Sequence, residues 1–219
     1  MTDYTPTPRT TLKRKPQRGR YDKTTVHAIL DAGLICTVAY VTDGHPVGIP
    51  TIYWREGGRV YWHGSAAGRA LQLQVDGAPV CFTVALLDGL ILARSAFRHS
   101  VNYRSVIAYG TARPVLRDAE KLSAMKGLID RLYPDRWEKI RPPNPGELAA
   151  VSVLYLDLEE VSAKVRADPP MDAEADLDLP VWAGVVPLVL EAGSPESCAQ
   201  LGPDAEAPGT WKGWTLERR

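Results

Sequence analysis

The segment LICTVAYVTDGHPVGIPTIYWREGGRVYWHGS (residues 34–65) decides the fold. It contains three runs rich in β-branched and aromatic residues, separated by the pairs Asp43-Gly44 and Gly57-Gly58. Such pairs between apolar runs are typical of β-hairpin turns. The segment therefore predicts an antiparallel meander with strands over 34–41, 47–55 and 59–63.

The rest of the chain repeats short strands joined by tight turns, with a few helices between them. Asp22 and Asp118 are typical helix caps, and Asp88-Gly89 predicts another hairpin turn. Six or seven short strands with two or three outer helices indicate a closed or partly closed antiparallel barrel, a mainly β fold with flanking helices. The further expected elements are helices over 23–31, 67–75 and from 118 to before Pro134, and strands over 79–87, 90–95, 101–116 and 151–165.

Composition divides the 219 residues into three parts. Residues 1–20 are basic and show no periodic apolar pattern, which predicts a flexible tail. Residues 21–166 contain the strand and helix patterns and form the expected barrel domain. Residues 167–219 are acidic and proline-rich, with one apolar island at 181–190, and we expect this extension to pack on the barrel.

The charge balance and the cysteines limit the function classes. Lysine and arginine together number 26, as do aspartate and glutamate, so total charge indicates neither a nucleic-acid nor a membrane partner. A basic tail can contact nucleic acid or an anionic surface, but a solvated, mobile terminus is the simpler interpretation and the one we prefer. No apolar run approaches a membrane span, so we expect a soluble, cytoplasmic protein. Three widely spaced cysteines favour free thiols, and no pair has metal-ligand spacing.

The stretch VYWHGSAAGRALQL (residues 60–73) carries the first candidate site. A strand ending at His63 runs into the small residues Gly64 and Gly68, where a ligand can approach the backbone. The Ser65 hydroxyl and the Arg69 guanidinium are suited to a phosphate. The Walker and dinucleotide-binding motifs are absent. An ordinary helix cap with a solvated arginine remains the alternative interpretation.

Two further clusters place cations on strands. Arg104 interrupts a β-branched and aromatic strand, and Ser162, Lys164 and Arg166 alternate on one face of the last strand. Each cluster alone is typical of a solvated face. Three such clusters in one small barrel favour an anionic ligand.

At these residues the chain resembles the flavin-binding split-barrel proteins related to pyridoxamine 5′-phosphate oxidase, in particular the nitroimidazole-reductase (Nim)-like subgroup. The similarity follows the family's order over roughly residues 20–190. It rests on IPTIY (49–53), YWHGS (61–65) with Gly68-Arg69, NYRSVIAYG (102–110), SAK (162–164) and VWAGVVP (181–187).

The resemblance implies a split β-barrel homodimer with FMN at the interface, touched by both chains. One set of residues would come from the chain that holds the flavin phosphate and ring, and another set from its partner. The first set is Pro50, Thr51, Ile52, His63, Gly64, Ser65, Gly68 and Arg69; the second is Tyr103, Arg104, Ser105 and Lys164. The oxidase's own substrate-binding arginine and histidine pattern is missing, so vitamin B6 oxidation is not expected.

The function that follows from the resemblance is an FMN-dependent oxidoreductase acting on a small molecule such as a nitro-aromatic compound. The flavin would carry the electrons, and His63 would act as an acid or hydrogen-bond donor near the ring. Two alternatives stay open. One is a non-catalytic flavin-binding or storage protein, and the other is a related split barrel that binds haem or a deazaflavin.

Overall fold

The computed structural model describes residues 3–202, and these confirm a mainly β fold with flanking helices. All strands of this part form one antiparallel sheet in the order β1-β9-β6-β5-β2-β3-β4-β8-β7, and β10 pairs with β5. The strands are β1 (Gly19–Arg20), β2 (Ile35–Thr42), β3 (His45–Glu56), β4 (Arg59–Ser65), β5 (Pro79–Leu92), β6 (Ser100–Thr111), β7 (Arg113–Pro114), β8 (Val151–Asp157), β9 (Glu160–Arg166) and β10 (Gly184–Pro187). The α-helices are α1 (Lys23–Ala32), α2 (Arg69–Val75), α3 (Asp118–Leu132) and α4 (Pro145–Ala149).

The meander predicted over residues 34–65 is confirmed as β2, β3 and β4. Asp43 and Gly44 both take positive φ, as the tight turn between β2 and β3 requires. Strand β3 is long enough to serve two partners in succession. Its first part pairs with β2 as far as Ile52, and its last part pairs with β4 from Tyr53 onward. This change of partner opens the barrel at one point.

The main core lies between β2, β5 and β6 on one side and β4, β8 and α1 on the other. Phe82 is fully buried at its centre, with its ring edge-on to Tyr53 at 5.2 Å and tilted against Trp62 at 6.2 Å. The Trp62 indole nitrogen donates to Gln74 of α2 at 3.0 Å. Apolar residues of both sheet halves thus meet around one aromatic cluster, and a polar contact with α2 satisfies the buried indole.

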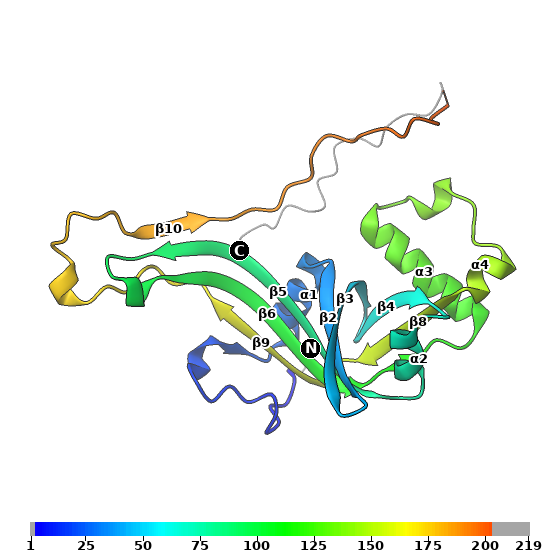
Figure 1. Cartoon of the computed structure of the whole chain (residues 1–219), viewed down its shortest axis with the longest axis horizontal. Coiled ribbons are helices and arrows are strands. Elements are labelled where there is room, and N and C mark those ends of the chain that lie inside the picture. The colour runs from blue at the N-terminus through cyan, green and yellow to red at the C-terminus, as the bar shows by residue number, and fades with distance from the viewer. Residues whose placement is uncertain (1–2, 203–219) are drawn as a thin grey trace.

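Each of the larger helices covers a different face. Asp22 caps α1, its carboxylate accepting from the Thr25 amide at 2.7 Å, and Ile29 is buried against the main core. Helix α3 packs Ala124 and Leu128 on Trp54 in a second, smaller cluster outside the barrel. Figure 1 shows α3 beside β4 and β8, away from the long β5–β6 pair.

Asp88-Gly89 is not a hairpin turn, so that prediction is wrong. Strand β5 runs straight through, and Asp88 is an extra residue between the pairs Leu87–Tyr103 and Gly89–Asn102, a β-bulge. The Asp88 carboxylate accepts two bonds from Arg104, at 2.9 and 2.7 Å. The Asp-Gly pair does not form a turn here, because Arg104 on the neighbouring strand supplies the hydrogen-bond partner of the Asp88 carboxylate. The chain reverses instead at 93–99, and β5 and β6 project from the barrel as a long arm (Figure 1).

The last predicted strand, over 151–165, is in fact two strands. Strand β8 ends at Asp157 and β9 begins at Glu160, so the chain reverses and the two strands occupy different places in the sheet. Leu158 stays buried in the core at this corner and its amide donates to the Gly58 carbonyl at 2.8 Å. An apolar residue at the turn hid the break, because alternation continues through it.

We expected a flexible tail over residues 1–20, but its described part, from Asp3 onward, packs on the barrel. Tyr4 is buried, and its hydroxyl and the His27 ring are 2.9 Å apart. Strand β1 pairs with β9, and Arg18 forms an ion pair with Asp168. Some positive charges of this N-terminal tail therefore meet acidic groups of the same chain instead of solvent.

The described part of the C-terminal extension packs mainly on the arm. Asn102 exchanges two hydrogen bonds with the Asp168 backbone, and Arg94 binds Asp172 at 2.7 Å. Strand β10 then adds to the outer half of β5. Residues 203–219 of the predicted extension lie outside the described part. Among residues 3–202, no helix has both the length and the apolar character to span a bilayer.

The cysteines give a direct test of burial. Burial raises the pKa of the Cys36 thiol to about 12, whereas Cys198 is exposed. Because the thiolate is the reactive form, we expect a thiol reagent at pH 8 to modify Cys198 quickly and Cys36 only after unfolding. Mass spectrometry of the labelled peptides measures this, and Cys198→Ser should remove the fast phase. Rapid labelling of Cys36 in the native protein would contradict the buried position.

Candidate functional site

The change of partner along β3 leaves one stretch of β3 and one stretch of β4 unpaired with each other, an interruption of the ladder that we call the notch. The ladder with β4 ends at the pair Tyr53–Trp62, so residues 50–52 of β3 and residues 63–65 of β4 are not paired with each other. The six residues comprise all of the predicted Pro50–Ile52 and His63–Ser65 positions, and none of them is fully buried. Backbone groups on facing, unpaired edges are available to hydrogen-bond a planar ligand.

The loop after β4 is shaped mainly by packing. A Cβ on Gly64 would lie 2.4 Å from the Leu71 side chain, and a Cβ on Gly68 would lie 3.0 Å from the Ser65 carbonyl oxygen. These glycines let α2 fold back closely on the end of β4. The Ser65 hydroxyl accepts from the Ala67 amide at 3.3 Å and is exposed. The two glycines of this motif are therefore needed for packing, whereas the Ser65 hydroxyl faces solvent.

Arg69 lies at the first turn of α2 with most of its side chain exposed. Its guanidinium meets the Asp43 carboxylate of the β2–β3 turn at 3.1 Å, and both side chains are 77% exposed. An exposed pair of this kind contributes little to stability. The arginine can therefore exchange Asp43 for a ligand phosphate at small cost.

His63 lies on the outer face of β4, in a largely apolar environment. Its ring is 6.2 Å from that of Trp54, in the cluster that α3 covers. The Nδ1 atom is buried and has no hydrogen-bond partner among the described residues. Burial lowers the pKa of His63 below its ordinary value, so the ring is mainly neutral at pH 7.

The second set of predicted residues lies elsewhere on the sheet. Ser105 and Lys164 are cross-strand partners on β6 and β9, and strands β5 and β2 separate β6 from β3. At about 4.8 Å per strand, Ser105 is roughly 14 Å along the sheet from the notch. One chain therefore does not bring Tyr103, Arg104, Ser105 or Lys164 to the notch. Arg104 is already committed to Asp88.

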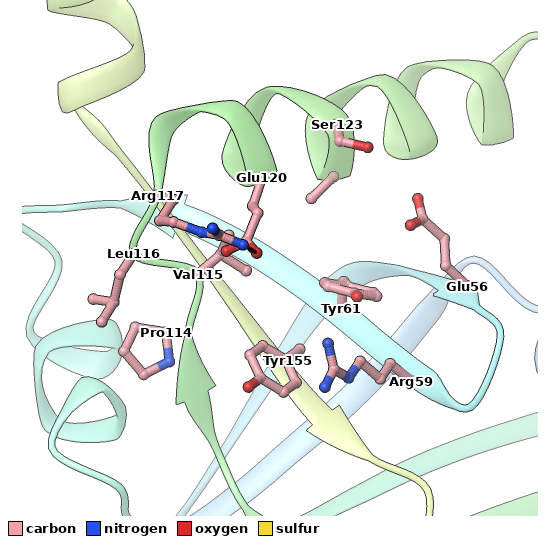
Figure 2. A pocket seen from close by; sticks show the side chains of 11 residues that line it. Glu56, Arg59, Tyr61, Pro114, Val115, Leu116, Arg117, Glu120, Ser123 and Tyr155 are labelled. Carbon is pink, nitrogen blue, oxygen red and sulfur yellow. Dashed lines mark hydrogen bonds and ion pairs between the residues drawn. The ribbon is translucent and has the colours of Figure 1, made fainter.

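A cavity of about 560 Å³ lies between β4, β8 and the start of α3. Figure 2 shows Tyr61, Tyr155 and Arg59 along its sheet side, with Glu120 reaching from α3. The Arg59 guanidinium stacks 4.4 Å from the Tyr155 ring centre and binds Asp157. Sequence reasoning did not identify this cavity, because its lining comes from four separate segments.

Comparison with known protein families identifies the family of this chain. The family model described as pyridoxamine 5′-phosphate oxidase matches residues 22–165. The chain belongs to this family. The resemblance inferred from the quoted motifs is thereby confirmed, and the matched residues run from the cap of α1 almost to the end of β9. No curated protein matches the chain.

Solved structures extend the similarity over nearly the whole chain of this family member. The flavocytochrome Anf3 from Azotobacter vinelandii is 42% identical, with 94% of this chain and 96% of that chain covered and a TM-score of 0.88. The FAD and haem binding protein from Mycobacterium smegmatis is 34% identical, with 90% and 97% covered and a TM-score of 0.85.

A more distant structure supports the fold alone. It is a putative 5-nitroimidazole antibiotic resistance protein from Bacteroides thetaiotaomicron, 19% identical, with 67% of this chain and 86% of that chain covered and a TM-score of 0.58. Metal sites built from protein ligands are not evident: within residues 3–202 no three His, Cys, Asp or Glu side chains gather to hold an ion.

Proposed function

We propose that this protein is a flavin-dependent oxidoreductase that binds its flavin in the notch between β3 and β4. The observation that carries the proposal is the pair of facing, unpaired strand edges at residues 50–52 and 63–65. Exposed Ser65 and Arg69 lie at one end of this notch. A planar, hydrogen-bonding ring with a phosphate at one end fits this arrangement of donors and acceptors.

FMN and FAD are the two candidate forms of the bound flavin. FMN and FAD both carry the phosphate that Ser65 and Arg69 would bind. The motif resemblance favours FMN, whereas the Mycobacterium smegmatis relative is named as binding FAD. Because the full-length similarity outweighs short motifs, FAD is the preferred ligand. Chromatography of the flavin released from the purified protein distinguishes the two.

Haem is the second cofactor that we propose. Of the two relatives reported above at more than 30% identity, one is named as a flavocytochrome and the other as an FAD and haem binding protein. A bound flavin would supply electron or hydride transfer with a small substrate, and a bound haem would supply one-electron transfer. The small-molecule substrate, such as a nitro-aromatic compound, remains an expectation from the motif resemblance. A flavin storage protein is the competing function, and it would not turn over.

A homodimer completes the proposed flavin site. Tyr103, Arg104, Ser105 and Lys164 are too far along the sheet to reach the notch of their own chain. In a dimer these residues would come from the partner. Arg104 would serve there by holding Asp88 and the bulge in place, unless the flavin displaces that aspartate.

His63 has a positioning role in this proposal. The His63 ring is mainly neutral, and its Nδ1 atom has no hydrogen-bond partner within residues 3–202. According to the tautomer, this atom can donate one hydrogen bond to the flavin or accept one from it. His63→Gln keeps a hydrogen-bonding group of similar length and removes the ring. A change of flavin reduction potential without loss of flavin binding would indicate that the ring tunes the flavin.

The test of the flavin site is a double variant, Ser65→Ala with Arg69→Ala. Each charge-assisted phosphate bond contributes about 1.5–3 kcal/mol, so flavin affinity should fall by roughly tenfold or more. Titration of apo-protein with FMN and with FAD, followed by flavin fluorescence, measures this. Arg141→Ala is the matched control, since Arg141 is also an exposed arginine in an ion pair, with Glu147. Unchanged affinity in the double variant would contradict the phosphate site.

A further inference from the structure

The cavity between β4, β8 and the start of α3 has a floor of aromatic rings. Trp54, Tyr61 and Tyr155 are cross-strand partners in one row, so their side chains share the outer face of the sheet. The Trp54 and Tyr61 rings are stacked with centroids 5.6 Å apart, and the Tyr61 and Tyr155 centroids are 5.9 Å apart. Both tyrosines line the cavity on its sheet side (Figure 2). A floor of this kind suits the flat face of an aromatic ligand.

Arg59 adds a cation to this floor. Its guanidinium carbon lies 4.4 Å from the Tyr155 ring centre, and its Nε atom donates to the Asp157 carboxylate at 2.7 Å. The two Nη groups of Arg59 donate to no carboxylate within residues 3–202. Arg113 is a second guanidinium at the same carboxylate, 3.7 Å away. Two cations therefore share one anion here, and the fork of Arg59 is left for the carboxylate of a ligand.

Glu56 lines the same cavity but forms no ion pair with Arg59. The two residues are cross-strand partners, an arrangement in which opposite charges commonly pair. The Glu56 side chain turns instead toward α3 (Figure 2). There a Cβ on Gly127 would overlap its carboxylate, and burial raises the pKa of Glu56 above its ordinary value. The missing side chain of Gly127 thus makes room for the acid and keeps it away from the guanidinium.

The other charges at the cavity come from the start of α3 and the residue before it. Arg117 and Glu120 form an ion pair, with 78% and 50% of their side chains exposed. An exposed pair of this kind contributes little to stability, so Arg117 can exchange Glu120 for a ligand at small cost. With Arg117, the cavity and its rim carry three guanidiniums beside the carboxylates of Asp157 and Glu120. Since Glu56 points at the helix, these surroundings favour an anion.

The aromatic floor continues along β4 toward the residues of the notch. His63 follows Tyr61 by two residues, so it lies on the same face of the strand, roughly 7 Å further along. The Trp54 ring connects the two, since its centroid is 5.6 Å from that of Tyr61 and 6.2 Å from that of His63. A ligand that lies on Tyr61 is therefore on the face of the sheet that carries His63.

We propose that this cavity binds a small aromatic carboxylate, with its ring against Tyr61 and Tyr155 and its carboxylate on the Nη groups of Arg59. The cavity volume of about 560 Å³ lies within the range of about 300–1,000 Å³ that is usual for small-molecule sites. Binding of this ligand does not depend on a flavin. Its use as the substrate class of the oxidoreductase rests on the proposed function, in which His63 would lie between the cavity and the bound flavin.

The experiment is calorimetric titration of the purified full-length protein, with the cofactors that it retains, with para-nitrobenzoate. Two matched ligands are titrated in parallel. The neutral para-nitrobenzyl alcohol keeps the ring and should bind roughly tenfold more weakly, and cyclohexanecarboxylate keeps the charge and should bind several-fold more weakly.

Three variants locate the site. Arg59→Gln should weaken binding of para-nitrobenzoate by roughly tenfold or more and leave binding of the alcohol unchanged. Glu56→Gln should not weaken it, because the acid points away from the ligand. Arg141→Gln is the matched control and should have no effect, since Arg141 is an exposed arginine paired with Glu147 near α4.

The comparison of the three ligands on the unmodified protein needs no variant, so it tests the inference even if Arg59→Gln does not fold. Equal affinity for para-nitrobenzoate and the alcohol, or unchanged affinity in a folded Arg59→Gln, would overturn the inference. Displacement of para-nitrobenzoate by FAD or haemin would also overturn it, because the cavity would then belong to a cofactor.

Failure of this inference and failure of the proposed function are distinguishable. A protein that binds FAD but no para-nitrobenzoate leaves the proposed function standing and overturns the anion site. A protein that binds para-nitrobenzoate through Arg59 but takes up no flavin supports the anion site and contradicts the proposed function.

Discussion

Phe82→Ala should lower the free energy of unfolding by about 3–5 kcal/mol. Phe82 is fully buried and touches the rings of Tyr53 and Trp62, which come from β3 and β4. Removing it leaves a cavity where the two halves of the barrel meet, and the surrounding strands cannot collapse into it without breaking their ladders. Most domains are stable by only about 5–15 kcal/mol, so the variant should be close to unfolding.

The protein contains its own control for this substitution. It has two phenylalanines, and the second, Phe97, is 89% exposed at the tip of the arm. Phe97→Ala should change stability by less than about 0.5 kcal/mol, as is usual at an exposed site. Urea unfolding followed by tryptophan fluorescence measures both. Equal effects of the two substitutions would mean that the arm tip is buried in solution or that Phe82 is not at the centre of the core.

Gly64→Ala should destabilise the protein by about 1–3 kcal/mol, a cost typical of overpacking. The new Cβ would lie 2.4 Å from the Leu71 side chain, which is itself buried in the core. Gly64 does not have positive φ, so the cost comes from packing and not from backbone strain. Gly58→Ala is the control, since nothing lies within 4 Å of its Cβ position and its φ is not positive.

A double-mutant cycle separates this packing cost from any other effect. If the clash with Leu71 is the cause, Gly64→Ala should cost less in a Leu71→Ala background, with a coupling energy of about 0.5–3 kcal/mol. Chemical unfolding of the four proteins of the cycle measures it. Additive costs would show that Gly64 has another role, such as leaving room for the flavin.

The sequence alone predicted the meander, the cap of α1 and the residues on either side of the notch. These features depend on neighbours in the chain: the turn pair Asp43-Gly44 acts within four residues, and Asp22 binds an amide three residues away. Local patterns of this kind specify hydrogen bonds between residues close together in the chain, so they can be predicted before the fold is known. The family motifs also named residues 50–52 and 63–65, which lie on β3 and β4; that these residues bind a flavin stays a prediction.

Only the tertiary structure decided what those residues meet. Asp88-Gly89 had the composition of a turn, but Arg104 from the neighbouring strand holds Asp88 in a bulge and β5 continues into the arm. The notch exists because β3 changes partners between Ile52 and Tyr53, which depends on pairing with β2 and β4 together. Contacts between segments that are distant in the chain decide these features. The energy of such a contact depends on both segments, so neither segment alone predicts it.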